Sequence, residues 1–129
     1  MRVNKKIIDV HLSMEPYRIG VWVWVCTSEE AKQAVKKTIY YTHYHCDPEG
    51  FNPGGGRCLS VDGSNYEPII WIDSGTKKSM RCINLAHEFV HVINRIFNCR
   101  GIALDYNNDE PYAYMMTYLM TQAKEKGIC

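Results

Sequence analysis

The first part of the chain alternates apolar and polar residues, a pattern that indicates β-strands. From Lys6 to Leu12, the apolar residues Ile8, Val10 and Leu12 share one side, as the two-residue period of a strand requires. The stretch 19–26 is apolar on both sides, so we expect a central strand that is covered on both faces. Two further strands are expected at 58–61 and 67–72, with a turn between them at 62–65.

Spacings of three and four residues between apolar positions predict three helices. The first begins at Thr27 or Ser28, which can both cap a helix, and runs to about Tyr44. The second begins at Thr76 or Ser79 and ends near Gly101. Its expected buried face consists of Ile83, Ala86, Val90, Ile93 and Phe97.

The third helix is expected from Tyr112 to Lys126, with its methionine-rich side in the core. The order strand, strand, helix, strand, strand, helix, helix predicts an α+β fold, with a small mixed β-sheet and helices on one face. A chain of 129 residues is long enough for one domain, 1–129, with a core of its own.

Charge and hydropathy exclude several classes of protein. A formal net charge of +1 gives no electrostatic drive toward nucleic acid or a membrane surface. No apolar run approaches the roughly 18 residues of a membrane span. The basic N-terminus is followed by Asp9 and His11, so it is not typical of a signal peptide. We therefore expect a cytoplasmic protein whose six cysteines are reduced.

Candidate chemistry is concentrated in the second predicted helix, in the sequence His87-Glu88-Phe89-Val90-His91. Residues four apart on an α-helix lie on one side, so His87 and His91 can bind one Zn²⁺ through their ring nitrogens. Glu88 lies beside that position and can accept a proton from a metal-activated water as the general base.

An open zinc site needs a third protein ligand. Glu110 follows His91 by 19 residues and begins the last predicted helix, where Asn107 and Glu110 also resemble a capping box and Pro111 suits the first turn. We favour Glu110 as the ligand. Weaker candidates also carry ligand atoms: His43, His45, Asp105 and Asp109.

The motifs 84–93 and 108–114 resemble a known family. They are similar to compact gluzincin-type zinc metallopeptidases, single-domain zincins found in phage and prophage genomes. The resemblance covers about residues 68–124 and implies one zinc per chain, held by two His and a Glu. The larger members often place a carboxylate four residues after the ligand Glu, where this chain has Tyr114, and they have a downstream catalytic His that this chain lacks.

The expected function is therefore zinc-dependent hydrolysis of a peptide or protein substrate. Tyr114 shares a helix face with Glu110 and is our candidate for a second catalytic residue. Other possible oxyanion donors remain open: Tyr106, Tyr112, His43 and His45. One alternative is a zincin-like regulatory or interaction module with little turnover. Another is a secreted, disulfide-linked protein without a metal.

Substrate placement is a further expectation. The strand 69–72 directly precedes the metal-binding helix, and Pro68 favours an edge position. An extended peptide could add to such an edge as an extra strand.

Overall fold

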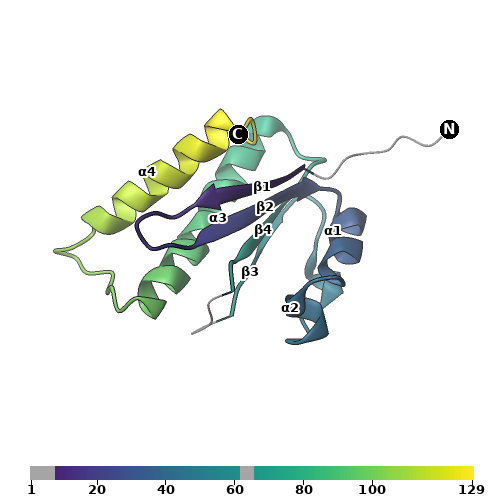
Figure 1. Ribbon diagram of the computed structural model, residues 1–129. Helices are drawn as coiled ribbons and strands as arrows, with labels where there is room; N and C mark the ends of the chain where they lie inside the picture. The colour runs from purple at the N-terminus through teal and green to yellow at the C-terminus, as the bar shows by residue number, and fades with distance from the viewer. Residues whose placement is uncertain (1–7, 62–65) are drawn as a thin grey trace.

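A four-stranded mixed sheet is the centre of the computed structural model, which describes residues 8–61 and 66–129 (Figure 1). The strands are β1 (Ile8–Ser13), β2 (Gly20–Cys26), β3 (Gly56–Leu59) and β4 (Ile69–Asp73). They lie in the order β1-β2-β4-β3. β1 and β2 are antiparallel, β2 and β4 are parallel, and β3 and β4 are antiparallel. The α+β class and the small mixed sheet are confirmed; the predicted turn 62–65 lies outside the described residues.

β4 is an interior strand, so the expectation that it forms an edge was wrong. Ile69 is opposite Trp22 of β2 on one side and Leu59 of β3 on the other. All five residues of β4 are buried. Pro68 is tolerated because it precedes the strand, where its carbonyl oxygen accepts a hydrogen bond from Trp22 N at 2.9 Å. Peptide binding by strand addition to β4 is therefore ruled out.

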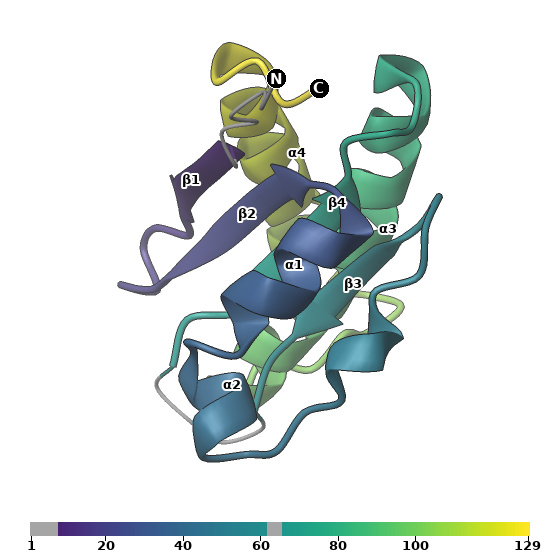
Figure 2. The same cartoon turned by 90° about the vertical axis from the view of Figure 1, so that its right-hand side faces the viewer.

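Helices cover both faces of the sheet, and not one face as the sequence suggested (Figures 1 and 2). α3 (Lys78–Cys99) and α4 (Glu110–Glu125) lie on one face. α1 (Ser28–Val35), α2 (Ile39–Thr42) and the 3₁₀ turn η1 (Pro48–Gly50) lie on the other. The cause is the two-sided apolar pattern of β2 and β4, which leaves no face that can be exposed to water.

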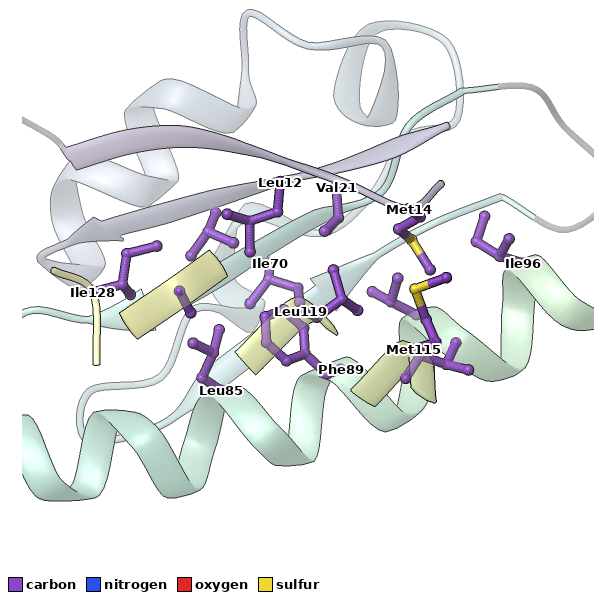
Figure 3. Close-up of a cluster of buried hydrophobic side chains, with 14 of the residues drawn as sticks. Leu12, Met14, Val21, Ile70, Leu85, Phe89, Ile96, Met115, Leu119 and Ile128 are labelled. Atoms are coloured by element: carbon purple, nitrogen blue, oxygen red, sulfur yellow. The ribbon is translucent and has the colours of Figure 1, made fainter. Parts of the chain in front are cut away.

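The larger core cluster lies between the sheet and helices α3 and α4 (Figure 3). Val21 and Ile70 come from the sheet, Leu85 and Phe89 from α3, and Leu119 from α4; all five are fully buried. Burying a side chain of this size contributes roughly 1.5–3 kcal/mol, so the cluster fixes α3 against β4. A second cluster under α1 and α2 is centred on Trp71.

The helix expected from Thr27 to Tyr44 is broken in two. Its start is confirmed, because Thr27 and Glu30 form a reciprocal capping box. The break occurs at Thr38, whose backbone is extended and whose hydroxyl donates to Val35 O at 2.7 Å. This side-chain bond occupies a carbonyl that a continuous helix would use, so α1 ends at Val35.

α3 is confirmed as a long helix, but its buried face differs from the expected one. Ile83 is 60% exposed and Val90 is 39% exposed. The sheet instead packs against another row of apolar residues on the same helix: Leu85, Phe89, Val92, Ile93, Ile96 and Phe97. The capping expectation was also wrong, since Lys77 is the N-cap and makes no side-chain cap bond.

A disulfide joins Cys82 of α3 to Cys129 after α4, so reduced thiols were the wrong expectation for this pair. It links the starting turns of α3 to the end of the chain over a sequence separation of 47 residues. Within residues 8–61 and 66–129, no helix combines the length and apolar character needed to cross a bilayer.

Candidate metal centre

Two histidine side chains converge on the outer side of α3. His87 and His91 are both exposed, one helical turn apart, and their Nε2 atoms are 3.3 Å apart. Their ring planes are inclined at 73°, so the two rings meet edge to face and do not stack. The helix brings the nitrogens together because residues four apart lie almost above one another.

Glu88 lies beside the histidine pair on the buried side of the helix. It is only 6% exposed, and its Oε2 makes no hydrogen bond to any of the described residues. Burial raises the pKa of Glu88, while the nearby His91 and His87 lower it. A buried carboxylate oxygen without a protein partner is costly, so this position suits a bound cation or a shared proton.

Among the residues that the structure describes, these three side chains form a group that could hold a metal ion. We call it the metal-capable group. One ligand atom from each of His87, Glu88 and His91 lies within 4.8 Å of the others. The sequence prediction that these residues come together is confirmed at this level. Two imidazoles and a carboxylate suit a borderline divalent cation such as zinc.

Space for Glu88 is created by a glycine in β3. A Cβ atom on Gly56 would lie 3.3 Å from Glu88 Cγ and 3.0 Å from the carbonyl oxygen of Trp71. Contacts of 3.0–3.4 Å are tighter than most real Cβ atoms make, so with a side chain here the strand or Glu88 would have to shift by a few tenths of an ångström. The triple glycine at 54–56 thus ends in a residue that lets β3 approach α3.

A hollow of about 290 Å³ opens between β3 and α3 beside this group. Its strand side is formed by 56–58 and Ser60, and its helix side by Glu88, His91 and Arg95. Cys58 faces Glu88, and burial, followed by the Glu88 charge, raises the pKa of its thiol to about 12. The thiol is therefore protonated at neutral pH in the metal-free protein.

The residues expected to complete the site line a different hollow. Glu110 and Tyr114 line a second hollow of about 520 Å³, together with Tyr17 from the β1–β2 turn. The two hollows share no lining residue, and Glu110 is not in the metal-capable group. Tyr114 is 72% exposed. The N-cap of α4 is Asp109 and not Asn107, and it makes no side-chain cap bond, so the predicted capping box was wrong. Pro111 does occupy the first turn of α4, as predicted.

The start of α4 nevertheless contacts α3. The Tyr112 hydroxyl donates to the carbonyl oxygen of Val90 at 3.0 Å. Val90 immediately precedes His91, so the first turn of α4 is fixed beside the turn that carries this histidine. Glu110 is two residues before Tyr112. The alternative ligands considered from the sequence, His43, His45, Asp105 and Asp109, are likewise outside the metal-capable group.

Sequence reasoning missed the contribution of β3. Gly56 and Cys58 both contact the region of Glu88, although they precede it by about thirty residues in the sequence. The available signal was the glycine run directly before a strand, which often marks close approach of another element. No pattern indicated which element would approach, because strand order depends on long-range pairing.

Comparisons of the chain with family models, with curated proteins and with solved structures give no match. Fold and site therefore define the class: an α+β domain whose long helix presents a His-Glu-x-x-His group that can hold a metal ion.

Proposed function

We propose that this protein is a zinc-dependent peptidase. The observation that carries the proposal is the distance of 3.3 Å between the Nε2 atoms of His87 and His91. Two nitrogens bound to one tetrahedral zinc at about 2.0–2.1 Å are about 3.3 Å from each other. The unpartnered Oε2 of Glu88 adjoins the same position. The residues present therefore fit zinc.

Bound zinc would supply Lewis-acid chemistry, polarising the peptide carbonyl and lowering the pKa of a coordinated water. Glu88 would hold the proton that the attacking water loses and return it to the leaving amine. Its burial under β3 excludes bulk water from the carboxylate. Unlike a solvated surface glutamate, Glu88 would therefore have the reacting water as its polar partner.

The edge of β3 supports binding of an extended peptide next to these groups. Among the described residues, β3 pairs with β4 alone. Asp73 N donates to Gly55 O at 3.2 Å, so these two residues form a hydrogen-bonded pair. Such pairs occur at every second residue of an antiparallel ladder, so Arg57 and Leu59 also direct their backbone groups toward β4. The backbone N–H and C=O groups of Gly56 and Cys58 alternate with these and point away from β4. A substrate strand could pair with them above Glu88.

Glu110 remains our candidate for the third ligand. The bond between Tyr112 and Val90 supports it, because it holds the first turn of α4 beside His91. A change of side-chain conformation at Glu110 would be required, since this residue lines the hollow beside Tyr17. Tyr114 would then lie one turn further along α4, as a candidate oxyanion donor.

A zinc-binding module with little turnover is the second candidate function. It is favoured by the distance of at most 4.8 Å that groups Glu88 with the two histidines. If Glu88 itself ligates the metal, it is no longer available as a base. The roles of Glu88 and Glu110 therefore distinguish the two functions.

Zinc content and peptide hydrolysis, measured on the same preparations, test the proposal. Wild-type protein should bind one zinc and degrade an unstructured protein such as casein, and a chelator should stop the reaction. His87→Ala and Glu110→Gln should bind zinc less tightly. Glu88→Gln should keep zinc and lose about 10²–10⁴-fold in turnover. An exposed Glu125→Gln variant serves as the matched control.

Two results would overturn the assignment. If Glu88→Gln releases zinc, Glu88 is a ligand and the binding module is the better description. If His87→Ala keeps its zinc with unchanged affinity, the metal is bound elsewhere.

A further inference from the structure

The hollow between the β1–β2 turn and the start of α4 has no part in the proposed mechanism (Figure 1). Its volume of about 520 Å³ lies within the range of sites that enclose a small ligand, roughly 300–1,000 Å³. Three tyrosines and two glutamates are among its described lining residues: Tyr17, Tyr114, Tyr118, Glu15 and Glu110. Aromatic rings and carboxylates from two segments far apart in the sequence thus border one space.

Helix α4 forms its side of the hollow with residues at a spacing of four. Glu110, Tyr114 and Tyr118 follow one another by one helical turn each, so they share one face of the helix. Met115, which also lines the hollow, is only 4% exposed and belongs to the larger core cluster. The hollow therefore has an apolar inner wall, while Glu110 is exposed to solvent at its border.

Two of the three tyrosines are held in position by contacts outside the hollow. The Tyr17 ring packs against Phe97, with 5.3 Å between the ring centres. The Tyr118 hydroxyl forms a hydrogen bond with Ser13 Oγ at 2.7 Å. Rings that are fixed before a ligand binds lose little conformational entropy on binding, so this wall is suited to recognition.

The two carboxylates of the hollow have no partner among the described residues. Neither Glu15 nor Glu110 makes a side-chain hydrogen bond or an ion pair within that part of the chain. The described residues that line the hollow include no lysine and no arginine. Two negative charges beside one apolar space, without a counter-charge in that lining, favour the binding of a cation.

Cations elsewhere in the chain do not neutralise this charge. Arg18 belongs to the β1–β2 turn and Arg100 donates to the backbone of that turn at 3.1 Å, but neither lines the hollow or forms an ion pair with its glutamates. The basic segment 1–7 leads into β1 at Ile8, which lies at the end of β1 opposite to the turn, about 17 Å away along the strand. The sequence 62–65 contains no lysine or arginine.

A lysine or arginine side chain matches this combination of groups. Its cationic end is attracted both by carboxylates and by the faces of aromatic rings within about 6 Å, and its aliphatic stem packs on apolar surface. Tyr114 is 72% exposed, so the hollow is accessible from solvent to a side chain that a peptide carries. A bound metal ion fits less well, because hard cations require about six oxygen ligands.

We infer that the hollow between the β1–β2 turn and α4 binds a lysine or arginine side chain of a peptide or protein segment, between its tyrosine rings and the carboxylates of Glu15 and Glu110. This binding site does not depend on the proposed peptidase function. It uses Glu110 in the conformation that the structure shows. If Glu110 turned to a metal instead, Glu15 and the tyrosines would still form the site.

Equilibrium binding of defined peptides tests the inference. Short fluorescent peptides, blocked at both ends, carry one arginine or one lysine in an otherwise uncharged sequence. Matched neutral peptides carry citrulline in place of arginine and acetyl-lysine in place of lysine, so that size and shape are nearly unchanged. The full chain is titrated after treatment with a chelator, because no metal-dependent cleavage then competes with binding and Glu110 has no metal to bind. Fluorescence anisotropy gives the affinities.

We expect at least one cationic peptide to bind about tenfold more tightly than its neutral counterpart at low salt, and the difference should shrink at high salt. Glu15→Gln and Tyr118→Leu should each reduce the preference about threefold. Tyr118→Phe keeps the ring and should keep the preference. Glu125→Gln is the matched control, since it removes the same charge from an exposed position of α4 outside the lining. Thermal unfolding verifies that each variant is folded.

The inference stands if Glu15→Gln and Tyr118→Leu both weaken the preference while Glu125→Gln retains it. It is overturned if the cationic and neutral peptides bind equally to wild-type protein, or if either of the two hollow variants retains the full preference. An equal loss in Glu125→Gln would also overturn it, because the preference would then reflect the overall charge and not this hollow. If Tyr118→Leu does not fold, Glu15→Gln against Glu125→Gln decides the question.

Discussion

Gly56 lies against Glu88 because it has no side chain: a Cβ atom on Gly56 would lie 3.3 Å from Glu88 Cγ. Strand β3 can therefore lie close over α3, and the Glu88 carboxylate is held between them. The position of the candidate general base depends on a residue that carries no functional group.

Gly56→Ala should reduce both stability and turnover. The added methyl group would lie 3.0 Å from the Trp71 carbonyl oxygen, so its surroundings must shift by a few tenths of an ångström, and overpacking of this kind costs about 1–3 kcal/mol of unfolding free energy. Chemical denaturation and a peptide hydrolysis assay provide the two measurements. Gly55→Ala is the matched control, because its Cβ would meet only Asn52 O, at an ordinary 3.5 Å. Equal behaviour of the two variants would refute the role given to Gly56.

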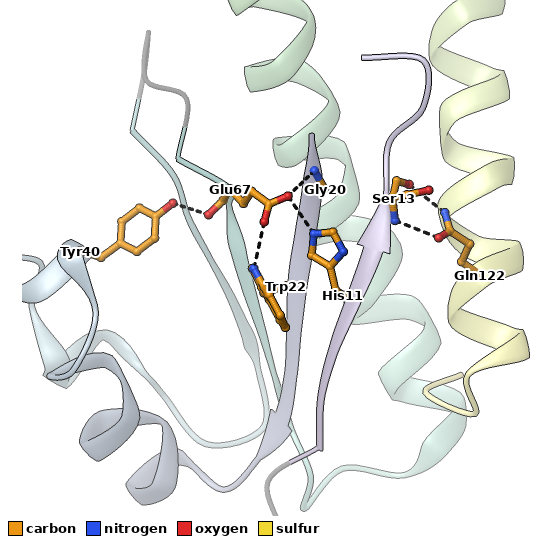
Figure 4. Close-up of polar contacts among 7 residues, drawn as sticks. All are labelled: His11, Ser13, Gly20, Trp22, Tyr40, Glu67 and Gln122. Atoms are coloured by element: carbon orange, nitrogen blue, oxygen red, sulfur yellow. Dashed lines mark hydrogen bonds and ion pairs between the residues drawn. The ribbon is translucent and has the colours of Figure 1, made fainter. Parts of the chain in front are cut away.

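Glu67 should make stability depend on pH in the acid range. Its carboxylate accepts hydrogen bonds from Gly20 N at 2.7 Å, His11 Nε2 at 2.8 Å and Trp22 Nε1 at 3.2 Å (Figure 4). Partial burial raises the pKa of Glu67, but the His11 bond and charge, with the other donors, outweigh burial and leave it lowered. A lowered pKa in the folded state means that protonation favours unfolding.

The stabilisation by Glu67 is therefore complete above the ordinary pKa of 4.5 and is lost as pH falls through the lower folded value. Denaturation curves from pH 7 to pH 2.5 should show this loss in wild-type protein. In Glu67→Gln the stability should be lower at pH 7 and the acid-dependent part smaller. Glu125→Gln, at an exposed position, should follow the wild-type profile. Identical pH profiles for Glu67→Gln and wild type would contradict this account.

The sequence predicted the parts of the site that follow from local periodicity. His87 and His91 converge because the helix geometry requires it, and the long apolar repeat was enough to predict that helix. Local periodicity did not decide which side of α3 is buried. Ile83 and Val90 form one acceptable apolar row, but the sheet packs on the row containing Phe89, which offers larger buried side chains.

Long-range pairing was beyond local patterns for a physical reason. Whether β4 is an edge or an interior strand depends on the position of β3, and the strand predicted at 58–61 gave no indication of its pairing partner. Local patterns could not predict the pairing of Cys82 with Cys129 either, because their proximity results from antiparallel packing of α3 and α4. Spacing alone does not reveal such a pair among six cysteines.

Reduction of the Cys82–Cys129 disulfide should destabilise the protein without removing the site. A link over this sequence separation restricts the unfolded chain and is worth about 2–4 kcal/mol. The double variant Cys82→Ser, Cys129→Ser should unfold at lower denaturant concentration, and reductant should have no further effect on it. Cys99→Ser, which changes a cysteine of the same helix outside this disulfide, is the control. Zinc binding should persist in the double variant, since His87 lies more than one turn from Cys82.

Tyr112→Phe should weaken the connection between α4 and α3. The variant removes only the hydroxyl that donates to Val90 O at 3.0 Å, so the unfolding free energy should fall by about 0.5–1.5 kcal/mol. If Glu110 is the third ligand, zinc affinity should fall as well, because the first turn of α4 loses its attachment beside His91. Tyr118→Phe is a close control, since that hydroxyl also makes a bond from α4, at 2.7 Å, but to Ser13 of β1. Competition with a fluorescent chelator gives the zinc affinity of both variants. If Tyr112→Phe is less stable but binds zinc with unchanged affinity, the start of α4 contributes to the fold and not to zinc binding. That result would count against Glu110 as a ligand.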